Sequence, residues 1–131
     1  MIQNKKDLLL KDLCARLPYG VKGRVSRSDN NNRKCEFVAI IDGKLYDRFA
    51  VFQESWYDNV TIKPYLFPLS SMTEEQKDEY VSLQQRVIYN SRGLVNLDVM
   101  EYTAWCYKHH IDINGLIPMG LAIDATGLNI Y

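Results

Sequence analysis

The stretch "EFVAIIDGKLYDRFAVF", residues 36–52, decides the fold class of this chain. Two apolar runs, rich in β-branched and aromatic residues, flank the Asp-Gly pair at 42–43. This dipeptide suits a two-residue turn that has positive φ at both positions, so the stretch predicts an antiparallel β-hairpin. In the register set by that turn, Ile40 lies opposite Leu45.

Other elements follow on both sides of the hairpin. At the start of the chain, Asn4 can cap a helix that Pro18 and Gly20 end. One apolar stripe is expected along it, made of Leu10, Leu13, Cys14 and Leu17. Residues 59–69 predict another strand, and the prolines at 64 and 68 place its later half on a sheet edge or in a loop.

The second half of the chain is helical in pattern. Ser71 with Glu74, and Thr73 with Gln76, each have the spacing of a capping box before a helix that runs to about residue 89. Asn96 can cap a last helix, closed by Asn-Gly at 114–115. Its predicted buried stripe is Leu97, Met100, Ala104, Tyr107 and Ile111.

Segregation of the strands from the helices predicts an α+β fold. We expect a single domain, residues 1–131, with an N-terminal helix and two C-terminal helices. Between them we expect a small, strongly twisted antiparallel sheet or a partial barrel. The composition, 47% hydrophobic and 24% charged, is that of an ordinary globular protein and argues against disorder and coiled coils.

The net charge of zero is unevenly distributed along the chain. Residues 1–48 carry eleven Lys or Arg and six Asp or Glu, whereas residues 49–131 carry five and ten. No apolar run approaches the roughly 18 residues that a membrane span needs. The three isolated cysteines form no CxxC pair and suggest free thiols in a reducing compartment. We therefore expect a cytoplasmic protein with no membrane partner.

Both histidines lie in "WCYKHHIDINGL", residues 105–116. Cys106 and His110 are four residues apart and share a helix flank, and Asp112 could add a third metal ligand, so a metal-assisted enzyme at these residues is one hypothesis. The alternative is structural, because polar residues at a helix C-terminus satisfy its carbonyl groups and its dipole. We favour that alternative. Motifs for nucleotide binding and for hydrolases are absent from the sequence, so we expect neither a cofactor nor an enzyme.

Cations crowd the segment that precedes the hairpin. They can track phosphate groups, so a nucleic-acid-binding module is one functional hypothesis. The neutrality of the chain and the absence of a recognised RNA-binding motif favour a solvated loop. The residues concerned, all within 22–34, are Lys22, Arg24, Arg27, Arg33 and Lys34.

Two polar segments are candidates for contact with a protein partner. One holds Asn30 and Asn31 in the expected loop before the hairpin, and the other holds Trp56 and Tyr57 after it. Loop aromatics often anchor a partner, although they also fold back over a core. The partner could be another protein or a second copy of this chain.

Three strings resemble segments of a group of small uncharacterised proteins from Bacteroidetes gut bacteria and their phages or mobile elements. They are "LLLKDLCARLPYGVK" (8–22), "IKPYLFPLSSMTEEQKDEY" (62–80) and "HHIDINGLIPMGLAIDA" (109–125). Residues 23–61 have no counterpart that we can place. The resemblance implies an accessory protein of a phage or prophage and implies no activity or catalytic residue. We therefore expect a non-enzymatic protein that acts by binding a protein partner.

Overall fold

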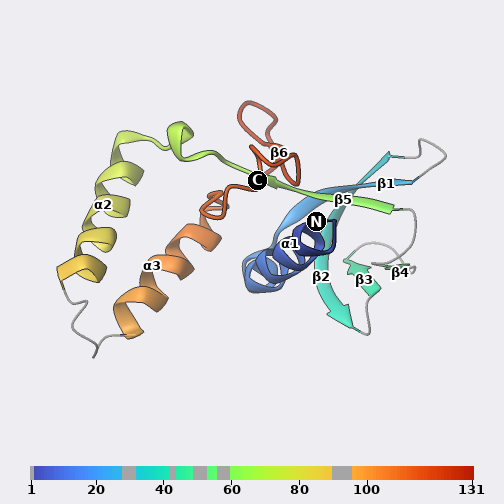
Figure 1. Cartoon of the computed structure of the whole chain (residues 1–131). Helices are drawn as coiled ribbons and strands as arrows, with labels where there is room; N and C mark the ends of the chain where they lie inside the picture. Colours follow the sequence, from blue (N-terminus) through green and yellow to red (C-terminus); the bar gives the residue numbers. More distant parts are fainter. Residues whose placement is uncertain (1, 28–31, 42–43, 49–52, 56–59, 90–95) are drawn as a thin grey trace.

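The computed structural model describes residues 2–27, 32–41, 44–48, 53–55, 60–89 and 96–131. Its helices are α1 (Ile2–Arg16), α2 (Glu74–Tyr89) and α3 (Asn96–Lys108), with short 3-10 turns η1 (Leu17–Tyr19) and η2 (Leu69–Ser71). Its strands are β1 (Lys22–Arg27), β2 (Asn32–Ile41), β3 (Lys44–Asp47), β4 (Gln53–Ser55), β5 (Val60–Leu66) and β6 (Ile123–Asp124). The α+β class, with one helix before the strands and two after them, is confirmed (Figure 1).

The sheet has the strand order β4-β3-β2-β1-β5-β6. The predicted hairpin is formed by β2 and β3, and Ile40 pairs with Leu45 as expected. The sheet does not close into a barrel, because β4 and β6 at its two ends do not pair within the described residues. The sheet is also mixed, since β6 lies parallel to β5 and the other pairings are antiparallel.

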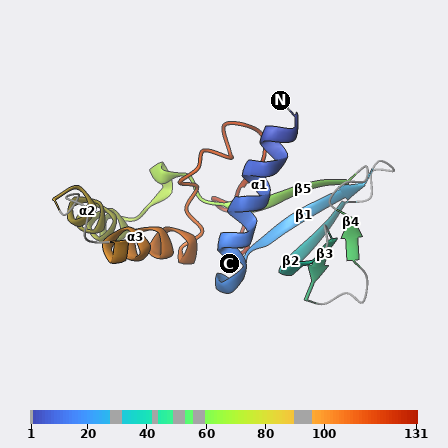
Figure 2. The same ribbon diagram turned by 60° about the horizontal axis from the view of Figure 1, so that its bottom comes forward.

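Helix α1 packs against one face of this sheet (Figure 2). Leu9 and Leu13 join the main core with buried residues of β1, β2 and β5, namely Val25, Cys35, Phe37 and Ile62. The predicted stripe of α1 is right at Leu13, which is fully buried, and at Leu10 and Leu17, which pack against the core, but it is wrong at Cys14. Cys14 is exposed, and the polar residues Asp12 and Arg16 are buried instead.

The C-terminal segment adds the last strand of the sheet, β6, which pairs with β5. Tyr65 and Pro64 are buried, although the two prolines predicted an edge or a loop here. The reason is that β5 pairs with β1 as far as Pro64, and β6 of the C-terminal segment pairs with Tyr65 and Leu66 beyond it. A small second cluster, made of Tyr65, Ala125 and Ile130, packs at this place.

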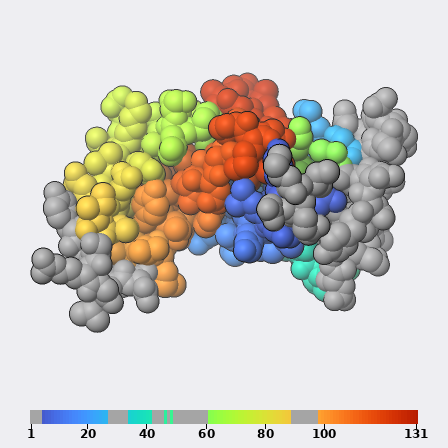
Figure 3. Space-filling model, in the orientation of Figure 1, coloured from blue at the N-terminus to red at the C-terminus, as the bar shows by residue number. Residues whose placement is uncertain are grey.

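Helices α2 and α3 form a hairpin that stands away from the sheet; we call it the arm (Figures 1 and 3). Thr73 and Gln76 form the predicted capping box, each accepting a backbone N–H bond of 3.1 Å from the other. Ser71 instead donates to the carbonyl of Pro68 within η2. The predicted stripe of α3 is wrong at Met100, whose side chain is 63% exposed.

Candidate functional site

A buried ion pair joins α1 to the segment that follows α3. Arg16 and Asp12 are four residues apart on α1 and form two hydrogen bonds of 2.5 and 3.2 Å. Arg16 also donates to the carbonyl oxygen of Ile111 at 2.8 Å, and Asn114 donates to Asp12 at 2.8 Å. Both charged groups are fully buried, and these bonds replace much of the water that the groups lose on folding, although Nη1 of Arg16 has no hydrogen-bond partner within the described part of the chain.

The two histidines mark the end of α3, as the structural interpretation expected. Helix α3 ends at Lys108, and His110 adopts a left-handed backbone with φ of 59°. Its N–H bonds to the carbonyl of Tyr107, and the next N–H, from Ile111, bonds to that of Cys106. This pairing is a Schellman motif, in which Gly is the usual left-handed residue. The closure predicted at 114–115 therefore occurs earlier.

The imidazole of His110 is a packing surface for the end of the chain. Its ring stacks on Tyr131 with 3.5 Å between centroids and an angle of 10°. Burial, assisted by the nearby positive charge of Arg16, lowers the pKa of His110 to about 4. Burial also raises the pKa of Tyr131 to about 12. The neutral ring is thus the form that the folded protein holds at pH 7.

Cys106, His110 and Asp112 do not assemble into a metal site. Each carboxylate oxygen of Asp112 accepts a backbone N–H bond of 2.8 Å, one from Leu116 and one from Ile117. Burial raises the pKa of the Cys106 thiol to about 11, which disfavours the thiolate that metals bind. Across the described part of the chain, no group of three or more His, Cys, Asp or Glu side chains has the placement of a metal site.

The protein-contact residues predicted from sequence cannot be placed. Asn30, Asn31, Trp56 and Tyr57 all lie outside the described residues. The remaining functional candidates are therefore the cationic residues of the sheet and the surface of the arm.

Most of the predicted basic loop is strand rather than loop. Residues 22–27 belong to β1 and residues 32–34 to β2. Arg24 lies opposite Lys34. Arg33 pairs instead with Val25, the residue that follows Arg24 in β1. Arg27 pairs with Val60 of β5. The five cations therefore do not form one continuous loop surface.

Two of these cations and one unpredicted lysine share a row across the sheet. Arg24 of β1 is flanked by Lys34 of β2 and by Lys63 of β5. Lys22 is engaged differently, because its ammonium group donates to the carbonyl of Ile130 at 3.0 Å. Lys63 could be found only after β5 was known to pair with β1, since the two strands are far apart in sequence.

Polar and aromatic contacts hold the two helices of the arm together. Tyr102 donates to the hydroxyl of Tyr80 at 2.9 Å, and the Trp105 indole donates to Glu79 at 2.7 Å. An ion pair of 3.1 Å joins Arg86 to Glu101. Burial, and then the bond to Tyr80, raises the pKa of Tyr102. Unlike α1 and the sheet, which we call the body, the arm has no apolar cluster of buried residues among its described side chains.

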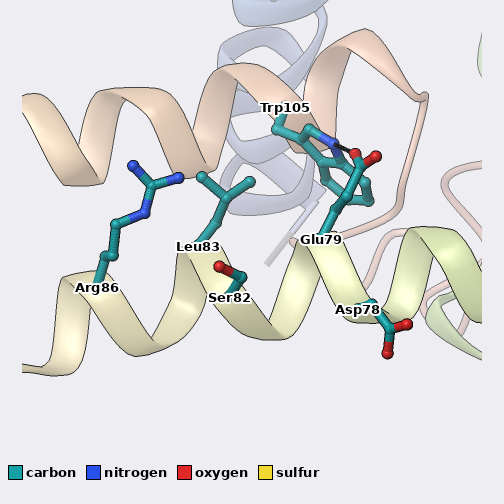
Figure 4. Close-up of a pocket in the computed structure, with 6 residues that line it drawn as sticks. All are labelled: Asp78, Glu79, Ser82, Leu83, Arg86 and Trp105. Carbon is teal, nitrogen blue, oxygen red and sulfur yellow. Dashed lines mark hydrogen bonds between the residues drawn. The ribbon is translucent and has the colours of Figure 1, made fainter.

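One face of the arm contains an open groove of about 480 Å³ (Figure 4). Leu83 and Trp105 supply its apolar surface, and Asp78, Glu79, Ser82 and Arg86 surround them. Apolar side chains elsewhere on the arm are exposed to solvent. They are Val81, Ile88, Val99 and Met100, with exposed fractions between 45% and 63%.

The charge imbalance seen along the sequence is also an imbalance in space. Residues 1–66, which form α1 and strands β1 to β5, contain twelve Lys or Arg and eight Asp or Glu. The acidic residues of α2 lie at the opposite end of the molecule from β3 and β4 (Figure 1).

Comparison of this chain with protein-family models, curated proteins and solved structures gave no match. Within its described residues, no helix is long and apolar enough to span a membrane.

Proposed function

We propose that this protein is a non-enzymatic accessory protein that binds a protein partner through its arm. The observation that supports the proposal is the lack of an apolar core in the arm. Among the described residues of α2, none is buried, and Cys106 is the buried residue of α3. Helices in proteins derive most of their stability from packing of an apolar face, so such an arm gains most from a partner that covers it.

The composition of the arm specifies the chemistry of that partner. Val81 and Ile88 are seven residues apart, so they share one stripe of α2, and both are exposed. Glu75 and Asp78 are also exposed and form no ion pair with any described residue. The complementary surface is an apolar patch with a basic rim on another protein.

The biological setting rests on the resemblance of residues 8–22, 62–80 and 109–125. It implies an accessory protein of a phage or mobile element in a Bacteroidetes gut bacterium, and the isolated cysteines favour the reducing cytoplasm. The structure adds that these three strings contact one another, through Arg16 with Ile111 and through Phe67 with His110 and Asp112. They form the junction from which the arm extends.

Site-specific photo-crosslinking tests the proposal. A benzoylphenylalanine at position 88 on the arm is compared with one at position 128, which is also exposed but lies in the C-terminal segment. We expect one protein of the host lysate to be captured at position 88 and not at 128. Unlabelled wild-type protein should compete, whereas the variant V81E/I88E should not.

The captured protein is then purified and its affinity for both forms is measured. Loss of two apolar anchors in an interface typically costs more than tenfold in Kd. Equal capture at both positions, or equal affinity of the variant, would contradict the proposal. A crosslinked product of twice the chain mass would identify a second copy as the partner.

A further inference from the structure

The row formed by Lys34, Arg24 and Lys63 runs across three adjacent strands of the sheet. Each pair is in direct register, Arg24 with Lys34 on one side and with Lys63 on the other. Directly opposed side chains in a sheet are about 5 Å apart at Cβ, so the positive charges are close neighbours. Arg24 and Lys34 are exposed, and Lys63 is half-buried.

This arrangement opposes folding in the free protein. Like charges placed directly opposite one another destabilise a sheet by a few tenths to about 1 kcal/mol per pair. Among the residues that the structure describes, no carboxylate forms an ion pair with any of the three cations. A negatively charged ligand would remove the repulsion, so the row is best explained by such a ligand.

The row lies on the face of the sheet opposite to α1. Side chains alternate along a strand, and the neighbours Gly23 and Val25 are buried against the core. Arg24 therefore points to the other face, where its guanidinium group lies 6.0 Å from the Tyr65 ring centroid. This contact holds the central cation of the row above an aromatic ring.

Neighbouring groups on this face suit a phosphate chain. Ser26 and Thr61 pair in the register position two residues from Arg24, and both hydroxyl groups can donate to phosphate oxygens. At the other end, the ammonium group of Lys22 lies 5.8 Å from the ring centroid of Tyr131, a residue that is 42% exposed. Cations interleaved with an accessible aromatic ring are typical of surfaces that bind single strands.

We propose that this face binds the phosphate backbone of a single-stranded nucleic acid without reading its sequence. The three cations of the row contact phosphates, and Tyr131, one face of whose ring is stacked on His110, offers the exposed part of its ring for stacking. This site is separate from the arm and does not depend on the function proposed for it. It also differs from the loop surface expected from sequence, because Lys63 belongs to it and Lys22 is held by Ile130.

Fluorescence anisotropy with a labelled 20-nucleotide oligothymidylate tests the proposal between 25 and 200 mM NaCl. The variant R24Q/K34Q/K63Q is compared with K5Q/K6Q/K11Q, which removes the same charge from α1. We expect the first variant to bind at least about tenfold more weakly and the second to stay within about threefold of wild type. The wild-type slope of log K against log salt should be about −2, as three phosphate contacts to a single strand require.

Several outcomes would overturn the inference. They are no binding at 25 mM NaCl, an equal loss in both variants, tighter binding of a duplex of equal length, or binding of anionic lipid vesicles in place of the oligonucleotide. Denaturant unfolding of both variants measures their stability and shows whether each one folds. Relief of the repulsion should leave the row variant at least as stable as wild type, so weaker binding cannot be attributed to misfolding.

Discussion

The body and the arm of this protein are held together by different physical means. In the body, α1 and the sheet bury apolar residues such as Leu13, Val25 and Phe37 around a fully desolvated ion pair. In the arm, α2 and α3 meet through tyrosine hydroxyls, an indole and a surface ion pair. The difference teaches that the body is stabilised by its own apolar core, whereas polar contacts between two helices hold the arm together.

The largest expected effect comes from breaking the buried pair of the body. Asp12→Ala leaves the Arg16 guanidinium buried without its carboxylate, and such a loss costs about 3–5 kcal/mol of unfolding free energy. Denaturant unfolding measures it. Lys11→Ala, at an exposed position on the same helix, should change stability by less than about 0.5 kcal/mol. A loss of unfolding free energy below about 1 kcal/mol in Asp12→Ala would show that water solvates the Arg16 guanidinium in the variant.

Close packing in the body predicts the next effect. A Cβ atom at Gly23 would lie 2.5 Å from Cε2 of Phe37 and 2.7 Å from the carbonyl oxygen of Lys63. The backbone cannot yield cheaply, so Gly23→Ala should cost about 2 kcal/mol or more. Ser26→Ala in the same strand is the control, and thermal unfolding gives the comparison. An unchanged melting temperature in Gly23→Ala would mean that β1 and β5 are not closely paired.

Acid should weaken the junction between the body and the arm. The pKa of His110 is lowered to about 4 in the folded state from an unfolded value of 6.5. The unfolded chain therefore binds more protons between these values, and stability is lost as pH falls from 6.5 to 4. We expect about 1–2 kcal/mol, less than the full shift implies because the ring is partly accessible.

Unfolding titrations at pH 7 and pH 4.5 measure this loss. His110→Asn keeps a residue that tolerates the left-handed backbone and removes the imidazole, so it should flatten the pH dependence. His109→Asn leaves the stacked ring in place and should retain it. The same pH profile in His110→Asn as in wild type would assign the effect to other groups.

The smallest expected effect is confined to the arm. Tyr80→Phe removes the acceptor of the Tyr102 hydroxyl, and the loss of such a bond costs about 1 kcal/mol. Hydrogen exchange should therefore speed up about fivefold in α2 and α3 while β1 and β5 stay unchanged. Faster exchange throughout the sheet would show that the arm and the body unfold together. It would contradict the view that the two regions are stabilised separately.

Local features were predictable from the sequence because short-range geometry determines them. The register of β2 with β3 and the Thr73–Gln76 capping box each depend on a few adjacent residues. The structural interpretation of the histidines was also correct in kind, since both lie at the end of α3. The predicted position of the helix end was wrong. Helix α3 ends before Asn114, because His110 adopts the left-handed conformation that is more common for Gly.

The sequence by itself therefore determined the fold class, the central hairpin and the start of α2. Tertiary structure alone decided that Asp12 and Arg16 are buried, because their four-residue spacing is equally typical of an exposed helical ion pair. It also decided that Lys63 joins Arg24 and Lys34, since strand pairing between distant segments selects which side chains become neighbours. Burial and long-range pairing are properties of the whole packed chain, and no local pattern encodes them.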